Sequence, residues 1–174
     1  MIYEPAEDSY LLEKYVKVFA KGDVLDLGCG SGIQTVAALS CKIKKIVGVD
    51  INPECVEYCK KKIPNAEFIV SDLFNNVKGK FDLIIFNPPY LPEDNLEDDE
   101  SALITTGGKE GYEIIEKFLS EADKFMKIDG KILIVVSSLT GDVDSLIKKY
   151  AFKFKILEKQ KIFFEELKVY LVWK

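Results

Sequence analysis

The feature that most constrains the fold is a regular alternation of short apolar runs and amphipathic segments along the chain. Continuous apolar runs are typical of strands buried on both faces of a parallel sheet. Apolar residues at three- and four-residue intervals indicate helices between those strands. The alternation therefore predicts an α/β fold, a mostly parallel sheet with helices on both faces. We expect strands over 24–27, 46–49, 68–70, 81–86 and 132–136, the last after a turn at Asp129-Gly130, and helices over 11–19, 33–40, 53–62, 114–125 and 142–150.

The last part of the chain departs from this alternation. Apolar and charged residues alternate over 152–156 and again over 167–171. Two adjacent strands with no helix between them predict an antiparallel hairpin that completes a seven-stranded sheet. The length of 174 residues suits one domain, and no repeat or low-complexity linker divides it. We therefore expect a single domain over residues 1–174.

Two residue types are missing from the chain, and their absence excludes whole classes of mechanism. There is no His, and all 24 basic residues are Lys. A histidine base, a histidine metal ligand or an arginine finger from this chain is excluded. The net charge of −5 argues against autonomous nucleic-acid binding. With no secretory leader or membrane span in view, we expect a cytoplasmic protein with reduced cysteines and no metal site. The cysteines are Cys29, Cys41, Cys55 and Cys59.

A glycine-rich segment, Asp26-Leu27-Gly28-Cys29-Gly30-Ser31-Gly32, follows the first predicted strand and precedes a predicted helix. Glycines allow a sharp turn there and let the backbone approach a ligand closely. The G-x-G-x-G spacing departs from the G-x-G-x-x-G of dinucleotide folds, and Asp26 would repel a pyrophosphate. A cationic ligand suits this turn better.

Two further acidic residues follow the next predicted strands. Asp50 ends the second strand, about 20 residues past the turn, where an acid can hold ribose hydroxyls. Asp72 ends the third strand and can accept from an adenine amino group. Because open α/β sheets bind ligands at the carboxyl ends of their strands, these acids indicate one crevice. A ligand with an adenosyl group and a positive charge is S-adenosylmethionine. A generic nucleotide fold, or a glycine turn without a ligand, is the alternative.

The segment Asn87-Pro88-Pro89-Tyr90 ends the fourth predicted strand beside the same crevice. Pro88 lacks a backbone donor and the two prolines stiffen the turn. The Asn87 side-chain oxygen and a backbone carbonyl can then both face outward as acceptors for a planar –NH₂ group, with Tyr90 stacked beside it. This pattern predicts methylation of an amide or amino nitrogen by positioning, without a histidine base. A plain Asn-Pro turn at a strand end is the alternative.

Taken together, residues 26–32, Asp50, Asp72 and residues 87–90 resemble the class I S-adenosylmethionine-dependent methyltransferases that carry an NPPY motif. Such a resemblance implies their Rossmann-like fold, with S-adenosylmethionine as methyl donor and S-adenosylhomocysteine as product.

The opening segment narrows the resemblance further. Tyr3-Glu4-Pro5-Ala6-Glu7-Asp8-Ser9 and the glycine-rich segment 107–111 resemble the archaeal and eukaryotic branch of the HemK-related protein-glutamine N5-methyltransferases. That branch implies methylation of the glutamine in the Gly-Gly-Gln motif of a class 1 peptide-release factor. Its members typically pair with a small zinc-binding activator protein, here expected over the edge strand 68–70, and lack the helical N-terminal docking domain of bacterial members.

Site residues follow from the resemblance by position. It implies that Asn87 touches both cofactor and target amide, with the Pro88 carbonyl as second acceptor and Pro89 and Tyr90 completing the turn. Tyr3, Glu4 and Asp8 are expected in a lid over the cofactor. The implied cofactor contacts are Tyr3, Ser9, Asp26, Gly28, Gly30, Asp50, Asp72, Leu73 and Asn87.

Three other functions remain open. An N6-adenine methyltransferase on DNA or RNA would present a similar –NH₂ group after base flipping, and a protein-lysine methyltransferase or a non-catalytic subunit is also possible. The acidic run Glu93-Asp94 and Glu97–Glu100 opposes a phosphate backbone and favours a protein substrate with a basic surface. Nucleic acid is therefore an unexpected partner, although the run can equally be a solvated charged segment.

Overall fold

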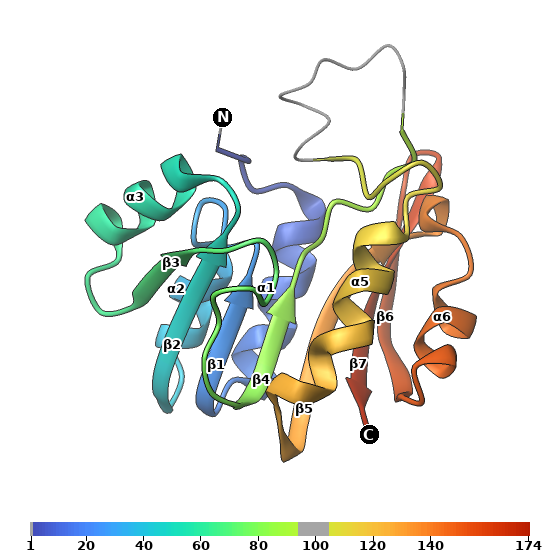
Figure 1. Ribbon diagram of the computed structural model, residues 1–174. Helices are drawn as coiled ribbons and strands as arrows, with labels where there is room; N and C mark the ends of the chain where they lie inside the picture. The colour runs from blue at the N-terminus through green and yellow to red at the C-terminus, as the bar shows by residue number, and fades with distance from the viewer. Residues whose placement is uncertain (1, 94–104) are drawn as a thin grey trace.

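The computed structural model describes residues 2–93 and 105–174. A twisted sheet of seven strands forms the centre of this described part (Figure 1). The strand order is β3-β2-β1-β4-β5-β7-β6. Strands β1 to β5 run parallel, whereas β7 is antiparallel to both β5 and β6. The predicted parallel sheet and closing hairpin are both confirmed. The strands are β1 (Gly22–Leu27), β2 (Ile43–Asp50), β3 (Glu67–Val70), β4 (Phe81–Phe86), β5 (Met126–Ser137), β6 (Lys153–Ile162) and β7 (Glu165–Trp173).

Helices cover both faces of this sheet, as the alternation predicts. One apolar cluster joins α1 and α2 to the sheet, and α3 packs on the same side through a smaller cluster that contains Cys59 and Phe68. On the opposite face, α5 and α6 share a larger cluster with β4 and β5. The helices are α1 (Glu7–Phe19), α2 (Ile33–Leu39), α3 (Pro53–Lys62), α5 (Glu113–Ala122) and α6 (Val143–Lys149), with 3-10 turns η1 (Asp123–Phe125) and η2 (Ser138–Thr140).

Local sequence explains where several helices begin. The Asn52 side chain accepts a hydrogen bond from the Glu54 amide at 2.9 Å, and Pro53 occupies the first turn of α3. Gly32 precedes α2 with a φ of 82°. A Cβ at Gly32 would lie 2.4 Å from the Ile63 side chain. This third glycine of the turn therefore allows α2 and α3 to pack closely, in addition to its positive φ.

The predicted turn at Asp129-Gly130 lies inside the residues assigned to β5. From the pair Phe81–Met126 to the pair Leu83–Lys131, β4 advances two residues whereas β5 advances five, so β5 makes an excursion at this point. A Cβ on Gly130 would lie 2.9 Å from the carbonyl oxygens of Lys127 and Phe81. Because Gly130 lies this close to Lys127, three residues earlier, the chain reverses over residues 127–130 as predicted, and the glycine also allows the close approach of the Phe81 carbonyl.

The described residues also bear on the other expectations. All four cysteines are unpaired, and no group of three metal-ligating side chains occurs in residues 2–93 and 105–174. Every helix of the described part is too short or too polar to cross a lipid bilayer. Strand β3 has only four residues and forms one edge of the sheet, as expected for the segment 68–70.

Candidate active site

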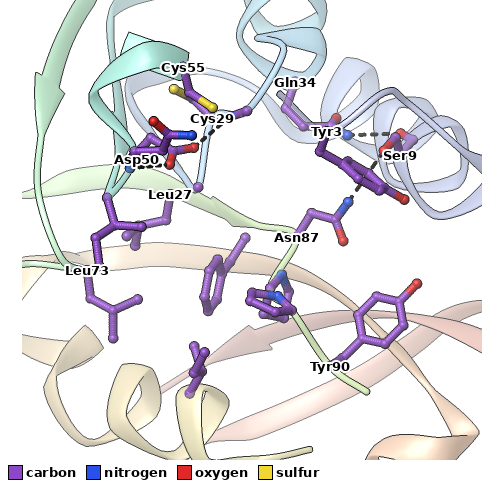
Figure 2. Close-up of a pocket in the computed structure, with 18 of the residues that line it drawn as sticks. Tyr3, Ser9, Leu27, Cys29, Gln34, Asp50, Cys55, Leu73, Asn87 and Tyr90 are labelled. Carbon is purple, nitrogen blue, oxygen red and sulfur yellow. Dashed lines mark hydrogen bonds between the residues drawn. The ribbon is translucent and has the colours of Figure 1, made fainter. Parts of the chain in front are cut away.

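A cavity of about 370 Å³ opens at the carboxyl ends of the parallel strands (Figure 2). Its volume lies in the range of small-molecule sites, roughly 300–1,000 Å³. The loops after β1, β2, β3 and β4 contribute to its wall, together with the segment that leads into α1. The structure brings nearly all predicted site residues to this wall: Tyr3, Ser9, Gly28, Gly30, Asp50, Asp72, Leu73, Asn87, Pro88, Pro89 and Tyr90. Glu4 and Asp26 are the exceptions.

Asp8 is the centre of the polar network in this cavity. Its carboxylate is 5% exposed and accepts hydrogen bonds from four residues. The Tyr3 hydroxyl donates to Oδ1 at 3.0 Å, and Ser9 donates to the same oxygen through its amide and its hydroxyl. On Oδ2, the Asn87 side-chain amide donates at 3.0 Å and the Tyr90 hydroxyl at 3.3 Å. One buried carboxylate therefore joins the opening segment to the NPPY turn.

The opening sequence segment predicts Asp8 in a lid over the cofactor but does not reveal this central role. Burial, followed by the nearby Asp8 charge, raises the pKa of the hydroxyls of Tyr3 and Tyr90. Both tyrosines therefore stay protonated and donate to Asp8 at neutral pH. One feature of the sequence could have identified Asp8. It is an acidic residue in the first turn of an amphipathic helix, and it lies on the same buried face of α1 as Leu11 and Leu12.

The side-chain amide of Asn87 has a fixed orientation. A carboxylate only accepts hydrogen bonds, so Nδ2 must face Asp8, and it also donates to the Ser9 hydroxyl at 3.4 Å. The opposite atom, Oδ1, is then held away from Asp8. This oxygen is buried and has no hydrogen-bond partner among the described residues. A buried acceptor without a donor is costly, so the site is complementary to an N–H group of a bound molecule.

The turn that carries Asn87 is held from two further sides. The Tyr90 amide donates to the Thr105 carbonyl at 3.1 Å, and the Thr140 hydroxyl donates to the Tyr90 carbonyl at 3.0 Å. Pro88 is buried, and below the turn Phe86 packs against Phe118 with a ring separation of 4.7 Å. The strand end, η2 and the diproline together make the NPPY turn a rigid element.

On the other side of the cavity, Asp50 is hydrogen-bonded to the glycine turn. The Gly30 amide donates to Oδ2 and the Asn52 amide to Oδ1, each at 2.9 Å. Burial raises the pKa of the Asp50 carboxyl from its ordinary value. Gly28, with a φ of 67°, keeps the wall between the β1 and β4 loops free of a side chain. Carboxylate oxygens fixed beside a bare backbone turn suit the hydroxyls of a ribose.

Asp26 lies elsewhere than expected. It is 1% exposed and does not line the cavity, and its Oδ2 accepts a hydrogen bond from the Thr35 hydroxyl at 2.6 Å. Burial raises its pKa to about 7. Asp26 therefore does not take the place beside a ligand that the sequence predicted, because its side chain is buried and bonded to Thr35 of α2. Its position instead joins β1 to α2.

Asp72 lines the cavity, but it is not a free acceptor. Its Oδ2 lies 2.7 Å from the Lys117 ammonium, and both side chains are about half exposed. Lys117 comes from α5, far away in sequence, and sequence reasoning did not identify it as part of the site. Nothing local marks it, since a lysine on the polar face of an amphipathic helix is ordinary.

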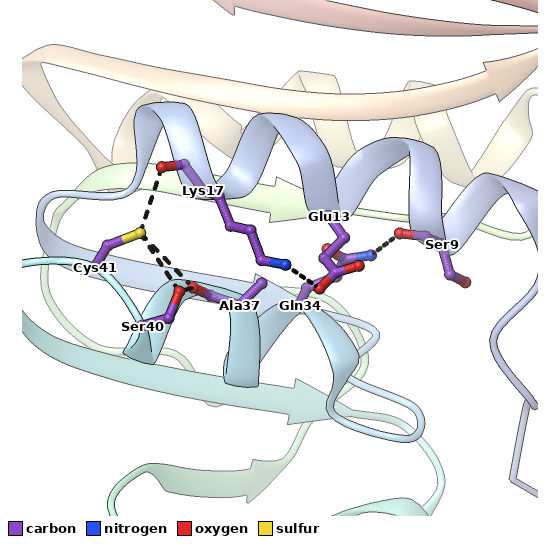
Figure 3. Close-up of polar contacts among 7 residues, drawn as sticks. All are labelled: Ser9, Glu13, Lys17, Gln34, Ala37, Ser40 and Cys41. Atoms are coloured by element: carbon purple, nitrogen blue, oxygen red, sulfur yellow. Dashed lines mark hydrogen bonds and ion pairs between the residues drawn. The ribbon is translucent and has the colours of Figure 1, made fainter.

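Gln34 is a second residue that the sequence analysis missed. Its Nε2 donates to the Ser9 carbonyl at 2.9 Å and so joins α2 to α1 (Figure 3). The side chain lines the cavity and is 4% exposed, and its Oε1 has no hydrogen-bond partner in the described part of the chain. The available signal was a lone polar amide in the segment Ile33–Leu39, which is otherwise apolar or small.

The charges of the wall indicate what the cavity can hold. Three carboxylates, Asp8, Asp50 and Asp72, face it, and of the described residues that line it only Lys117 is cationic and is already paired. Apolar side chains cover much of the remaining surface. A cation with an apolar body and several hydroxyls and amines is complementary to this wall, whereas a pyrophosphate is not. Within the predicted acidic run, Glu93 is exposed, and residues 94–100 lie outside the described residues.

Comparison with known proteins agrees with this geometry. Residues 7–164 match the family described as Methyltransferase small domain. A Methanocaldococcus jannaschii protein with the provisional name protein N5-glutamine methyltransferase is 44% identical, covering 99% of this chain and 92% of its own. The Aquifex aeolicus release factor glutamine methyltransferase is 32% identical over 76% of this chain, which spans about half (53%) of that relative.

Among solved structures, a chain of the E. cuniculi Mtq2–Trm112 complex superposes with a TM-score of 0.79. It is 25% identical, and the match covers 99% of this chain and 98% of that one. That complex is described as methylating the eRF1 translation termination factor.

Proposed function

This chain belongs to the Methyltransferase small domain family, and its relatives include protein-glutamine N5-methyltransferases. On that basis we propose the reaction that it catalyses. It transfers a methyl group from S-adenosylmethionine to the side-chain amide nitrogen of the glutamine in the Gly-Gly-Gln motif of a class 1 peptide-release factor. The product of the donor is S-adenosylhomocysteine. Because the acceptor belongs to the translation machinery, we expect the enzyme to act in the cytoplasm.

The observation that carries this proposal is the buried oxygen of Asn87. Asp8 and Ser9 fix the amide so that Oδ1 lacks a donor among the described residues. A glutamine –NH₂ supplies such a donor. The Pro88 carbonyl is the second acceptor in this proposal, so that the two oxygens hold both amide protons and orient the nitrogen. Tyr90, which lines the cavity, would stack beside the plane of the glutamine amide.

The residues of the wall fit S-adenosylmethionine as donor. Asp50 would hold the ribose hydroxyls, Asp72 and Leu73 would contact the adenine, and Ser9, Gly28 and Gly30 would border the methionine part. When bound, the sulfonium supplies an electrophilic methyl group. The chain contributes alignment, exclusion of water and carboxylates that favour a cation. The new carbon–nitrogen bond would replace the methyl carbon–sulfur bond of the donor, which would leave as neutral S-adenosylhomocysteine, and the amide nitrogen would release one of its two protons to water.

We also propose a heterodimer with a small zinc-binding activator protein at strand β3. This strand lies at the edge of the sheet, β2 is its only partner among the described strands, and its Val70 is 44% exposed. An exposed edge strand is prone to pair with another chain unless a partner covers it. The E. cuniculi neighbour is solved as a complex with Trm112, which supports a partner for this chain, and the exposed edge is the reason to place that partner at β3.

The test is transfer of label from S-[methyl-³H]adenosylmethionine to the source organism's release factor, with and without the activator protein. A release factor whose Gly-Gly-Gln glutamine is replaced serves as the control, and DNA and tRNA serve as competing acceptors. Label on that glutamine, lost in the control, is the expected result. Label on nucleic acid would instead indicate an adenine methyltransferase, and label on a lysine would contradict the amide geometry.

A further inference from the structure

Two phenylalanines stand fully in solvent at the tip of the β6–β7 hairpin. Phe163 is 97% exposed and Phe164 is 100% exposed, and they form the two-residue loop between the paired residues Ile162 and Glu165. Exposed single apolar residues are common, but two adjacent aromatic rings in a tight loop form a small apolar patch without intramolecular contacts to explain it. Packing within the chain therefore does not account for these residue types.

The backbone of this loop makes the choice of residues more unusual. Phe163 has a φ of 45°, in the left-handed region. Two-residue hairpins use Gly, Asn or Asp at such positions, and a bulky residue with positive φ is an outlier. Strained residues that folding does not require are concentrated at functional surfaces. The hairpin tip therefore carries two aromatic residues, although exposed positions favour polar residues and tight hairpin turns favour Gly, Asn or Asp.

The tip lies on the same rim as the NPPY turn. The amide of Glu166 donates to the Ser138 hydroxyl at 2.9 Å, and the Ser137 hydroxyl donates to the Glu165 carboxylate. Two residues further on, Thr140 in the same short turn donates to the Tyr90 carbonyl. Figure 1 shows the hairpin reaching the upper end of the molecule beside the segment that follows β4.

The distance along the strands fits a docking role. Leu167 pairs with Ser137 at the end of β5, so Phe164 lies about 10 Å beyond that level at about 3.3 Å per residue. The rings therefore lie beyond the carboxyl end of the sheet, on the same end as the cavity and beside it, since β7 is two strands away from β4. They are too far out to touch a cofactor seated in the cavity, but they are placed to meet the body of a protein that inserts a glutamine side chain.

We propose that Phe163 and Phe164 form an apolar docking contact for the protein substrate, next to the point where its glutamine enters. The inference rests on the proposed function and deepens it, because it assigns part of the substrate recognition to a surface outside the cavity. The occupant is a patch of apolar or aliphatic side chains on the release factor near its Gly-Gly-Gln loop. Continuity with the cavity rim selects this occupant over a second copy of the chain or a lipid surface.

The experiment compares steady-state methylation of the intact release factor and of a short peptide with Gly-Gly-Gln at its centre. The variant is Phe163→Gly/Phe164→Ser, because Gly-Ser is a favoured two-residue hairpin loop and keeps the turn. Ile128→Ser is the matched control, since Ile128 is 100% exposed at the opposite end of the sheet. All proteins are assayed as the complex with the activator protein, and cofactor affinity and oligomeric state are measured alongside.

We expect the double variant to raise KM for the intact release factor about tenfold or more. Its kcat, its cofactor affinity and its rate on the peptide should stay within about twofold of wild type, as should every value for Ile128→Ser. Unchanged KM for the intact protein would overturn the docking contact. Equal losses on the peptide, or a changed oligomeric state, would overturn it as well. If wild type itself fails to label the release factor, the proposed function fails, and the docking site fails with it.

Discussion

At the scale of single residues, the site is built on side chains whose neighbours leave them one orientation. Asp8 only accepts, so the amide of Asn87 and the hydroxyls of Tyr3 and Tyr90 must turn their protons towards it. The free oxygen of Asn87 results from that constraint. Preorganised acceptors of this kind cost no reorganisation during the reaction, which is where most of the catalytic advantage of a positioning enzyme lies.

We expect Asp8→Asn to lower kcat by more than tenfold while the protein stays folded. The –NH₂ group of the new asparagine replaces one of the two carboxylate oxygens, both of which accept hydrogen bonds. Its N–H groups would then face other donors, either those of Tyr3 and Ser9 or those of Asn87 and Tyr90. The free energy of unfolding should fall by about 1–3 kcal/mol for the unsatisfied groups. Glu7→Gln, at the exposed acid next in sequence, should leave both quantities unchanged. Wild-type kcat in Asp8→Asn would contradict the alignment role.

Asp26 gives a pH-dependent prediction. Burial raises its pKa to about 7, whereas the carboxyl of an unfolded chain ionises near ~4. Its contribution to stability is therefore complete below about pH 4 and is lost as the pH rises towards about 7. In Asp26→Asn this loss disappears. The variant should gain about 2–3 kcal/mol on wild type between pH 5 and pH 8, measured by chemical denaturation.

The control for that experiment has the opposite sign. Ser145, through its hydroxyl and its amide, lowers the pKa of Asp142, so the contribution of this exposed cap is present at neutral pH and is lost on acidification. Asp142→Asn should therefore not gain on wild type as the pH rises. A flat difference between Asp26→Asn and wild type across the range would show that the Asp26 carboxyl ionises normally in the folded protein.

At this scale the sequence was a partial guide. It identified Asn87, Asp50 and the glycines because their spacing follows strand ends, and strand ends meet at one crevice. It misplaced Asp26, because the direction of a side chain at the last residues of a strand depends on the register of that strand. It missed Gln34 and Lys117, since their importance comes from contacts with segments distant in sequence: Gln34 with Ser9 of α1, and Lys117 with Asp72 in the loop after β3.

At the scale of elements, the two edge strands of the sheet differ in how well they are protected from pairing with another chain. Strand β3 is short and open along one side, whereas β6 at the other edge carries lysines at alternating positions. Alternating charge on an edge strand discourages pairing with other chains. Strand β3 contains no such lysine. This asymmetry agrees with a partner at β3.

Val70→Lys tests that surface. A lysine at this 44% exposed position should change the free energy of unfolding by no more than about 0.5 kcal/mol. It should also reduce aggregation of the isolated chain and weaken the complex with the activator protein at least tenfold, measured by titration calorimetry. Val18→Lys, at a 68% exposed site on α1, is the matched control. Undiminished affinity in Val70→Lys would place the partner elsewhere.

Elements were the part of the structure that the sequence predicted best. Segments such as 53–62 and 81–86 have strong periodicity or continuous apolar runs, and their predicted bounds agree with α3 and β4. The turn at Asp129-Gly130 is present, but it lies within β5, whose bounds Met126–Ser137 are therefore wider than the predicted 132–136. The hairpin loop Phe163-Phe164 could not be recognised from its residues, since they contradict the usual turn preferences.

At the scale of the whole molecule, composition and architecture point to one kind of chemistry. A chain without His or Arg has no ordinary general base near neutral pH and no guanidinium for phosphate. The architecture instead places carboxylates and amide oxygens around a cavity at the carboxyl ends of the four parallel strands β1 to β4. Such a site suits a cationic methyl donor and orients the N–H group of a methyl acceptor. The fold could be predicted because alternation alone specifies it, whereas the direction of each acceptor required the structure.

The measurement that tests this account most directly is methyl transfer by Asn87→Ala beside its affinity for S-adenosylmethionine. Both would be determined on the same preparation of the complex, with the release factor as acceptor. We predict that transfer falls by at least about a hundredfold, because the acceptor that orients the amide is gone, while the dissociation constant of the cofactor changes less than about threefold. Transfer within about threefold of wild type, or loss that is explained by failure to bind the cofactor, would contradict the role assigned to Asn87.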